Sequence, residues 1–151
     1  MRAEINFVKS NEKRKIIEQL KEQYGIEDLP FLLLKTGKEK CRGYSGHLSK
    51  EEIDELGELA NIEIVGLYLI KEEHDLRLSF DTPLLLKDQI KKNILEINPA
   101  DFHLWIRGND LDIKVPQGTY IIKFGEDFFG CGKSNGEKIF NYVPKDRRLR
   151  K

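Results

Sequence analysis

Apolar residues in the first half of the chain recur at helical spacing in one segment and at strand-like spacing in the next. Residues 11–24 carry an apolar helical face, so we expect a helix there, with Ser10 as its N-cap and Gly25 as its end. The compact run PFLLLK that opens at Pro30 predicts a strand, and a short second strand is expected over residues 39–44.

A capping pattern marks the start of a second helix. Ser49 is followed three residues later by Glu52, and Leu48 stands where a staple residue would. The run IEIVGLYLI, residues 62–70, is rich in β-branched residues and predicts a buried strand. Helix, strands, helix and strand together indicate a small α/β domain over residues 1–73.

The second half has mainly the two-residue alternation of strands. LRLSF, from Leu76, reads as a half-exposed strand, and both Thr82-Pro83 and Asn98-Pro99 combine an N-cap residue with proline at the first helical position. Further strands are expected over residues 93–97, 111–115, 118–124, 128–133 and 138–143. We therefore expect a mostly antiparallel β-barrel or rolled sheet over residues 74–151, and an α+β fold for the whole chain.

Composition narrows the setting. The chain has 151 residues, of which 34% are charged, and these are mostly Lys and Glu, which suits a thermophilic source. Cys41 and Cys131 are far apart and form no CxxC, which favours a reducing cytoplasm over a disulfide scaffold. The start, MRAEINF, lacks the apolar region of a signal peptide, and no apolar run is long enough for a membrane span. We expect a cytoplasmic protein.

Charge is polarised along this formally neutral chain. After Cys131 there are seven Lys and Arg against two acidic residues, so the preceding part carries the compensating acidic excess. Such asymmetry indicates a polyanionic partner, most often nucleic acid, although a merely solvated basic tail has the same composition.

Motifs for catalysis or cofactors are missing from the sequence. His47, His74 and His103 lie in unrelated segments without metal-ligand spacing. The run Gly132-Lys133-Ser134 resembles the end of a phosphate-binding loop, but Asp127 stands where that motif needs its first glycine. We therefore expect no catalytic residue, no metal and no cofactor, and we interpret the glycines as positions of tight turns or close strand packing.

One family resemblance covers the second half. The segments WIRG, residues 105–108, and GTYIIKFGEDFFGCGKSNGEKIFNYVPKDRRLR, from Gly118, resemble a PUA domain, most closely the PUA-like appendage of RsmF-type (Sun-class) RNA cytosine methyltransferases. The pattern Asn-Tyr-x-Pro-Lys-x-x-Arg is present from Asn141 to Arg148. The layout also resembles small ribosome-biogenesis factors that join a preceding domain to a PUA domain. The resemblance implies a pseudo-barrel that binds structured RNA, without the methyltransferase domain.

Candidate RNA-binding residues come from this basic, aromatic region. They are Arg107, Lys123, Lys133, Asn141, Tyr142, Lys145, Arg147 and Arg148. Cations suit phosphates and Tyr142 suits base stacking, whereas Tyr142 could equally close the barrel core and Lys123 could equally lie on a solvated strand face.

Two functions remain open at the level of sequence, and a small enzyme is a residual third because groups distant in sequence could still gather in space. The first is a non-catalytic protein that binds rRNA or tRNA in RNA modification or ribosome biogenesis. The second is an accessory subunit whose acidic first half binds a separately encoded RNA methyltransferase or a ribosomal protein.

Overall fold

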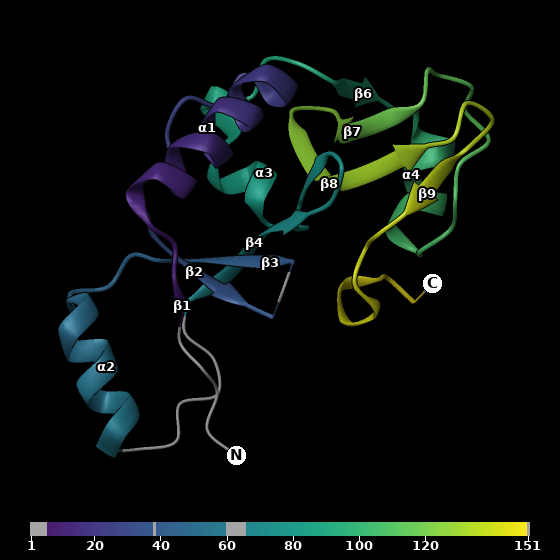
Figure 1. The fold of residues 1–151 in the computed structure, drawn as a ribbon. Helices are drawn as coiled ribbons and strands as arrows, with labels where there is room; N and C mark the ends of the chain where they lie inside the picture. The colour runs from purple at the N-terminus through teal and green to yellow at the C-terminus, as the bar shows by residue number, and fades with distance from the viewer. Residues whose placement is uncertain (1–5, 38, 60–65, 151) are drawn as a thin grey trace.

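The computed structural model describes residues 6–37, 39–59 and 66–150, and these residues form an α+β fold built on two sheets (Figure 1). The first sheet contains β1 (Asn6–Phe7), β2 (Leu32–Thr36), β3 (Lys40–Tyr44), β4 (Leu67–Glu72) and β5 (Leu76–Leu78). The second contains β6 (Ile94–Glu96), β7 (Gly118–Phe124), β8 (Asp127–Ser134) and β9 (Ile139–Asn141). The helices are α1 (Ser10–Tyr24), α2 (Lys50–Leu59), α3 (Thr82–Leu85) and α4 (Pro99–Ile106), and short 3₁₀ turns span Lys87–Gln89 and Lys145–Arg147.

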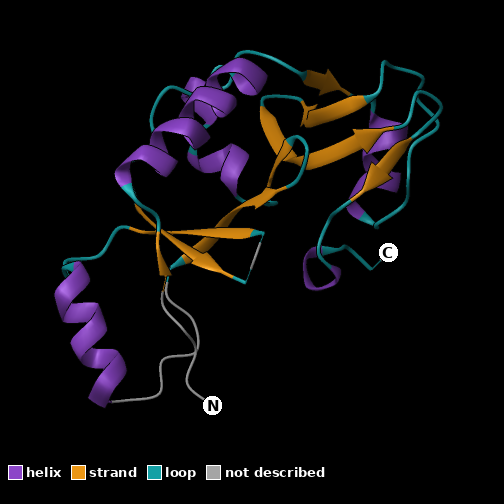
Figure 2. Cartoon of the chain, viewed as in Figure 1, coloured by secondary structure: helices purple, strands orange, loops and turns teal. Residues whose placement is uncertain are grey.

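The first sheet is an antiparallel meander in which each strand pairs with the next. Helix α1 buries Ile16, Leu20 and Tyr24, which are the apolar face expected from the sequence, and ends at Gly25 in the left-handed conformation (φ 83°). Helix α2 projects away from both sheets, at the lower left of Figure 1. Figure 2 shows the two groups of strands side by side, with α1 and α3 toward one side of them.

The second sheet is mostly antiparallel, as expected, but β6 runs parallel to β7 and reaches it through a crossover that contains α4. The strand expected over residues 111–115 is wrong: only Leu111 bridges to Ile139, and the residues after it are extended without pairing. Their alternation arises because Ile113 and Val115 pack against the second core while Lys114 faces solvent.

The starts of two helices have the side-chain caps that the sequence predicts. The expected capping box is present, because the Glu52 N–H donates to Ser49 Oγ at 3.1 Å and the Ser49 N–H donates to Glu52 Oε1 at 3.4 Å. Asn98 likewise caps α4 by accepting the Asp101 N–H at 2.8 Å. The expected caps Ser10 and Thr82 are wrong by one position, since both are the first residues of their helices. The Thr82 hydroxyl donates instead to the carbonyl of Leu69, in the buried floor of the first sheet.

The two halves share a core. The first apolar cluster contains residues of α1 and the first sheet together with Ile121, Phe128 and Cys131 of the second sheet. A second cluster, around Trp105, lies under the other face of the second sheet. The division expected between residues 73 and 74 falls in the β4–β5 hairpin and stays a prediction. Residues 62–65 of the strand expected over 62–70 lie outside the described residues.

Among the described residues, no helix is both long enough and apolar enough to cross a bilayer.

Candidate nucleic-acid interface

The structure separates the predicted RNA-binding residues into groups. Lys123 and Lys133 belong to the same β7–β8 hairpin but lie toward its opposite ends, because Lys123 pairs with Phe128 and Lys133 pairs with Thr119. Lys123 also faces Glu96 across the parallel β6–β7 pairing. The hairpin therefore removes Lys123 from the region where the other cations gather.

A pocket of about 130 Å³ opens between the two sheets, and we call it the seam pocket. Its walls come from β4, β5 and the turn after β5 on one side, and from β8 and the segment after β9 on the other. Its lining residues are Leu67, Tyr68, Arg77, Leu78, Ser79, Phe80, Asp81, Cys131, Tyr142 and Pro144. Aromatic rings and a guanidinium thus meet in one concave place.

Arg77 is the central cation of the seam pocket. Its guanidinium lies over the Tyr142 ring, 3.9 Å from the ring centre, and one terminal nitrogen lies 3.4 Å from Glu73 Oε1. Only 12% of its side chain is exposed. Its Nε is buried and has no hydrogen-bond partner among the described residues. A buried donor without an acceptor is costly, so this nitrogen is an unsatisfied polar atom in a residue that lines the pocket.

The C-terminal 3₁₀ turn brings a second arginine to the same pocket. Arg147 Nη1 donates to Asp81 Oδ2 at 2.8 Å, and its guanidinium lies 4.9 Å from the centre of the Phe80 ring. Both Phe80 and Asp81 line the pocket. The segment after β9 is therefore attached to the turn after β5 across the seam.

Lys133 is a third cation near the seam pocket, besides Arg77 and Arg147. It forms an ion pair with Glu73, and its Nζ lies 6.0 Å from the Tyr142 ring centre. Partial burial, with the nearby Lys71 cation, lowers the pKa of Lys133 below the ordinary lysine value. Lys71 itself lies 3.6 Å from Glu73, so three cations share this one carboxylate. Lys71 also lies 3.7 Å from Glu39, and Arg147 pairs with Asp81, so the four cations near the pocket have three carboxylate partners.

Asn141 has a different environment from the one the sequence suggested. Its Nδ2 donates to the carbonyls of Trp105, at 2.8 Å, and Asn109, at 2.9 Å, and its Oδ1 accepts the Val143 N–H at 2.8 Å. Its backbone N–H donates to Asp110 Oδ1 at 2.8 Å. Its side chain connects α4 to the C-terminal segment and has little capacity left for a ligand.

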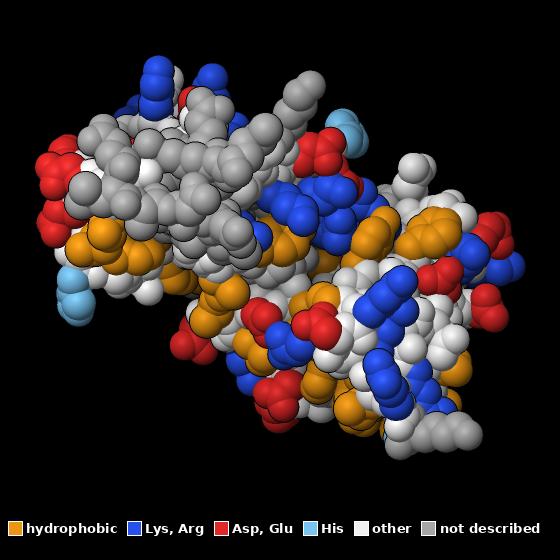
Figure 3. Space-filling view, turned by 90° about the horizontal axis from the view of Figure 1, so that it is seen from below, with side chains coloured by type: hydrophobic (Ala, Val, Ile, Leu, Met, Phe, Trp, Pro, Cys, Tyr) orange, Lys and Arg blue, Asp and Glu red, His pale blue; other side chains and the backbone are white. Residues whose placement is uncertain are grey.

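The remaining predicted cations lie along the end of the chain. Arg148 is half-buried, and its Nε donates to the Val143 carbonyl at 3.0 Å. The Leu149 N–H donates to the Ile106 carbonyl at 2.8 Å, which holds the tail against the residue before Arg107. Arg107 and Lys145 are exposed. Figure 3 shows several Lys and Arg side chains toward the lower right of the molecule, with hydrophobic and acidic groups among them.

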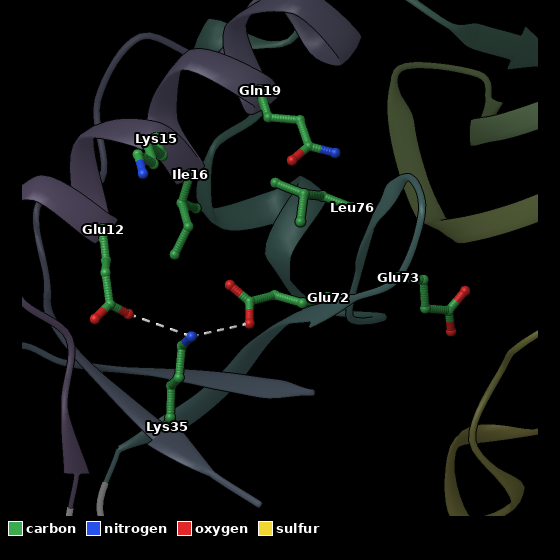
Figure 4. A pocket seen from close by; sticks show the side chains of 8 residues that line it. All are labelled: Glu12, Lys15, Ile16, Gln19, Lys35, Glu72, Glu73 and Leu76. Carbon is green, nitrogen blue, oxygen red and sulfur yellow. Dashed lines mark ion pairs between the residues drawn. The ribbon is translucent and has the colours of Figure 1, made fainter. Parts of the chain in front are cut away.

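A second hollow, of about 250 Å³, lies between α1 and the first sheet, and we call it the ionic hollow (Figure 4). Lys35 Nζ lies 3.3 Å from both Glu12 Oε2 and Glu72 Oε2. Burial lowers the pKa of Lys35, but the contacts with Glu72 and then Glu12 outweigh that effect and leave it raised. The cation at the centre of this hollow is thus paired with two carboxylates.

Both cysteines are buried free thiols. Burial raises the pKa of Cys41 to about 12, with a smaller contribution from Glu72, and burial raises the pKa of Cys131 to about 12. Neither thiol is a nucleophile near neutral pH. Among the described residues, no group of His, Cys, Asp and Glu has the arrangement of a metal site.

Sequence reasoning missed Arg77, Phe80, Asp81 and Glu73. Arg77 sits in the alternating run LRLSF, where it looks like a solvated strand residue, and its partner Tyr142 follows 65 positions later. The only local signal was Glu73, four residues before Arg77.

Known proteins are similar to this chain in part of its sequence and in its fold. Residues 92–149 match the family model described as the methyltransferase RsmF PUA domain. The fold is similar to the structure of a conserved PUA domain protein from Thermoplasma acidophilum, with a TM-score of 0.61, 16% identity, and coverage of 92% of this chain and 93% of that one. A comparison with curated proteins gave no match. Residues 92–149 are therefore similar to a PUA domain of the RsmF type, within an α+β fold that also includes the first sheet and resembles that of a PUA domain protein.

Proposed function

We propose that this chain is a non-catalytic RNA-binding protein whose PUA-like domain docks on structured RNA. The observation that carries the proposal is the gathering of Arg77, Lys133 and Arg147 with the Tyr142 and Phe80 rings around the seam pocket. Guanidinium and ammonium groups bind phosphates, and aromatic rings stack on unpaired bases. The match to a PUA domain supports the same conclusion from sequence.

The finer part of the proposal concerns the RNA and the process. We propose rRNA or tRNA as the ligand, in RNA modification or ribosome assembly in the cytoplasm, because the matched model describes the PUA domain of a methyltransferase. The matched region is the PUA domain and not a methyltransferase catalytic domain. Binding needs no cofactor under this proposal.

Filter binding of purified rRNA and tRNA across a salt series tests the proposal. The logarithm of the affinity should fall linearly with the logarithm of salt concentration, because phosphate contacts release counterions. The double variant Lys145→Gln and Arg147→Gln should lower the salt slope by about two. Lys123→Gln, at the other end of the β7–β8 hairpin, is the matched control and should leave the slope unchanged. Absence of binding at low salt would overturn the proposal.

A second candidate is a protein-interaction role, favoured by α2. This helix projects from the molecule, has Glu51 and Glu52 in its first turn, and leaves Leu56 43% exposed (Figure 1). A basic protein such as an RNA methyltransferase or a ribosomal protein would complement that surface. Partners that remain bound after nuclease treatment of a native lysate, and that are lost in Leu56→Lys, would favour this role.

A further inference from the structure

We propose that the seam pocket receives one unpaired base of the bound RNA. This inference rests on the proposed RNA-binding function and specifies what part of the RNA enters the protein. It concerns a site that neither the sequence patterns nor the family match assigned.

The shape of the pocket fits a single flat ring system. Its volume of about 130 Å³ is small, and its walls include the rings of Tyr68, Phe80 and Tyr142 together with the apolar side chains of Leu78 and Cys131. Bases in a duplex are stacked on both faces and cannot enter a hollow of this size. An unpaired base in a loop or bulge can be turned out and placed against aromatic rings.

The polar groups of the pocket match the edge of a base. Arg77 Nε is a buried donor without a partner, and the carboxylate of Asp81 is an acceptor at the same pocket. Every base presents acceptors along its edge, and adenine, cytosine and guanine also present amino donors. Arg77 Nε has no acceptor among the described residues, and a base carbonyl or ring nitrogen that reaches it would satisfy it.

The guanidinium of Arg77 is held for this task by its stacking on Tyr142 at 3.9 Å and by Glu73 at 3.4 Å. Its plane is therefore fixed before any ligand arrives, which lowers the entropy lost on binding. Lys133 lies near the ring of Tyr142, and Arg147 lies near the ring of Phe80. Each cation is therefore next to a different aromatic wall of the pocket. They can bind the phosphates before and after the base that enters.

The test compares short RNA hairpins that differ only in their loops. One set has loops of A, C, G or U, and the matched probe has the same backbone with abasic loop nucleotides. All probes carry equal charge, so phosphate contacts cancel in the ratio of affinities. We expect at least one base-containing loop to bind about tenfold more tightly than the abasic loop, as one stacked and hydrogen-bonded base would give.

Two variants locate this effect. Tyr142→Ala removes an exposed ring that is 38% accessible, and Arg77→Lys keeps the charge but removes the planar group and its Nε donor. Both should reduce the ratio to near one while binding of the abasic probe persists. Lys123→Gln should leave the ratio unchanged. Circular dichroism and thermal unfolding of each variant confirm that it remains folded.

The outcomes separate this inference from the proposed function. Equal affinity for abasic and base-containing loops, with clear salt dependence, would overturn the base pocket and leave RNA binding intact. A ratio that neither variant changes would place base recognition elsewhere. Free nucleoside monophosphates that bind as tightly as the hairpins would assign the pocket to a mononucleotide, and failure of all hairpins and of natural rRNA and tRNA would overturn both proposals.

Discussion

The ionic hollow and the seam pocket are both lined by charged side chains, yet their charges are arranged differently. In the ionic hollow, Lys35 lies 3.3 Å from two carboxylates, so one cation is paired with two anions. Arg77 of the seam pocket shares the carboxylate of Glu73, which lines the ionic hollow, with Lys133 and Lys71, and Arg77 Nε has no partner among the described residues. The two hollows thus differ in pairing as well as in volume, because only the seam pocket has a cation with an unsatisfied donor among the described residues.

The largest effect we expect is on stability, at Asn141, which precedes the pocket residue Tyr142. Asn141→Ala should lower the free energy of unfolding by about 2–4 kcal/mol, because three side-chain hydrogen bonds are lost and the carbonyls of Trp105 and Asn109 lose a donor. Urea unfolding measures this change. Asn109→Ala is the matched control, since its side chain makes only a bond of 3.3 Å to Leu104, and it should cost less than about 1 kcal/mol.

A small stability change in Asn141→Ala, accompanied by a large loss of RNA affinity, would contradict this assignment. Asn141 would then be a ligand contact, as the sequence suggested, and the seam pocket would extend farther along the C-terminal segment.

Alkaline pH should weaken the core around the two buried cysteines, of which Cys131 lines the seam pocket. The pKa of each cysteine rises to about 12 on folding, so above pH of about 9 the unfolded chain releases protons that the folded chain keeps. Stability should therefore be complete below about pH 8.5 and fall as the pH rises toward 12. Tyr24 and Tyr68, whose pKa values burial also raises, add to the same fall.

Urea unfolding at a series of pH values checks this prediction. Cys131→Ala and Cys41→Ala should each make the fall shallower, by at most about 1.4 kcal/mol per pH unit. If Cys131 instead reacts with a thiol reagent at neutral pH while Cys41 does not, water reaches Cys131 through the seam pocket and the prediction for Cys131 is wrong.

Glu72 and Glu73 both line the ionic hollow, but only Glu73 contacts Arg77 of the seam pocket, so the two residues allow a matched comparison. Glu73→Gln removes the carboxylate that three cations share and should tighten RNA binding about threefold at low salt, because phosphates no longer compete with it. Glu72→Gln changes the charge by the same amount but acts on Lys35 in the ionic hollow (Figure 4). It should leave RNA affinity unchanged and cost less than about 1 kcal/mol of stability. Equal effects of the two variants on RNA binding would show that only overall charge matters.

The smallest expected effect is that of Lys123→Gln. Lys123 lies at the other end of the β7–β8 hairpin from Lys133 and faces Glu96 on β6. RNA affinity should change by less than about twofold, which a filter-binding titration resolves. A loss comparable to that of Lys133→Gln would mean that the RNA spans the whole hairpin.

Much of the fold was predictable because its signals are local. The Ser49–Glu52 and Asn98–Asp101 caps involve residues three positions apart, and the structure contains both. Residues 111–115 have the alternation of a strand, but pairing depends on a neighbouring strand, and only Leu111 has one. Thr82 resembled a cap because nothing local shows that its hydroxyl reaches Leu69.

The site was less predictable, because its contacts join distant positions. The sequence identified Tyr142, Lys133 and Arg147 as candidates, and these three do gather at the seam. It did not identify Arg77, whose significance depends on the ring of Tyr142 and on an unpaired nitrogen that only the folded chain defines.

The shared core has a consequence for the stability of the matched segment when it is separated from the rest of the chain. Ile121, Phe128 and Cys131 lie within the matched segment 92–149, yet they are buried against residues of α1 and the first sheet. The segment excised alone would expose this apolar face to water, so the intact chain should melt in a single transition and the fragment should self-associate. The residues before the matched segment thus shield its apolar face from water. In another protein, a domain with the same apolar face would need an equivalent apolar surface packed against it.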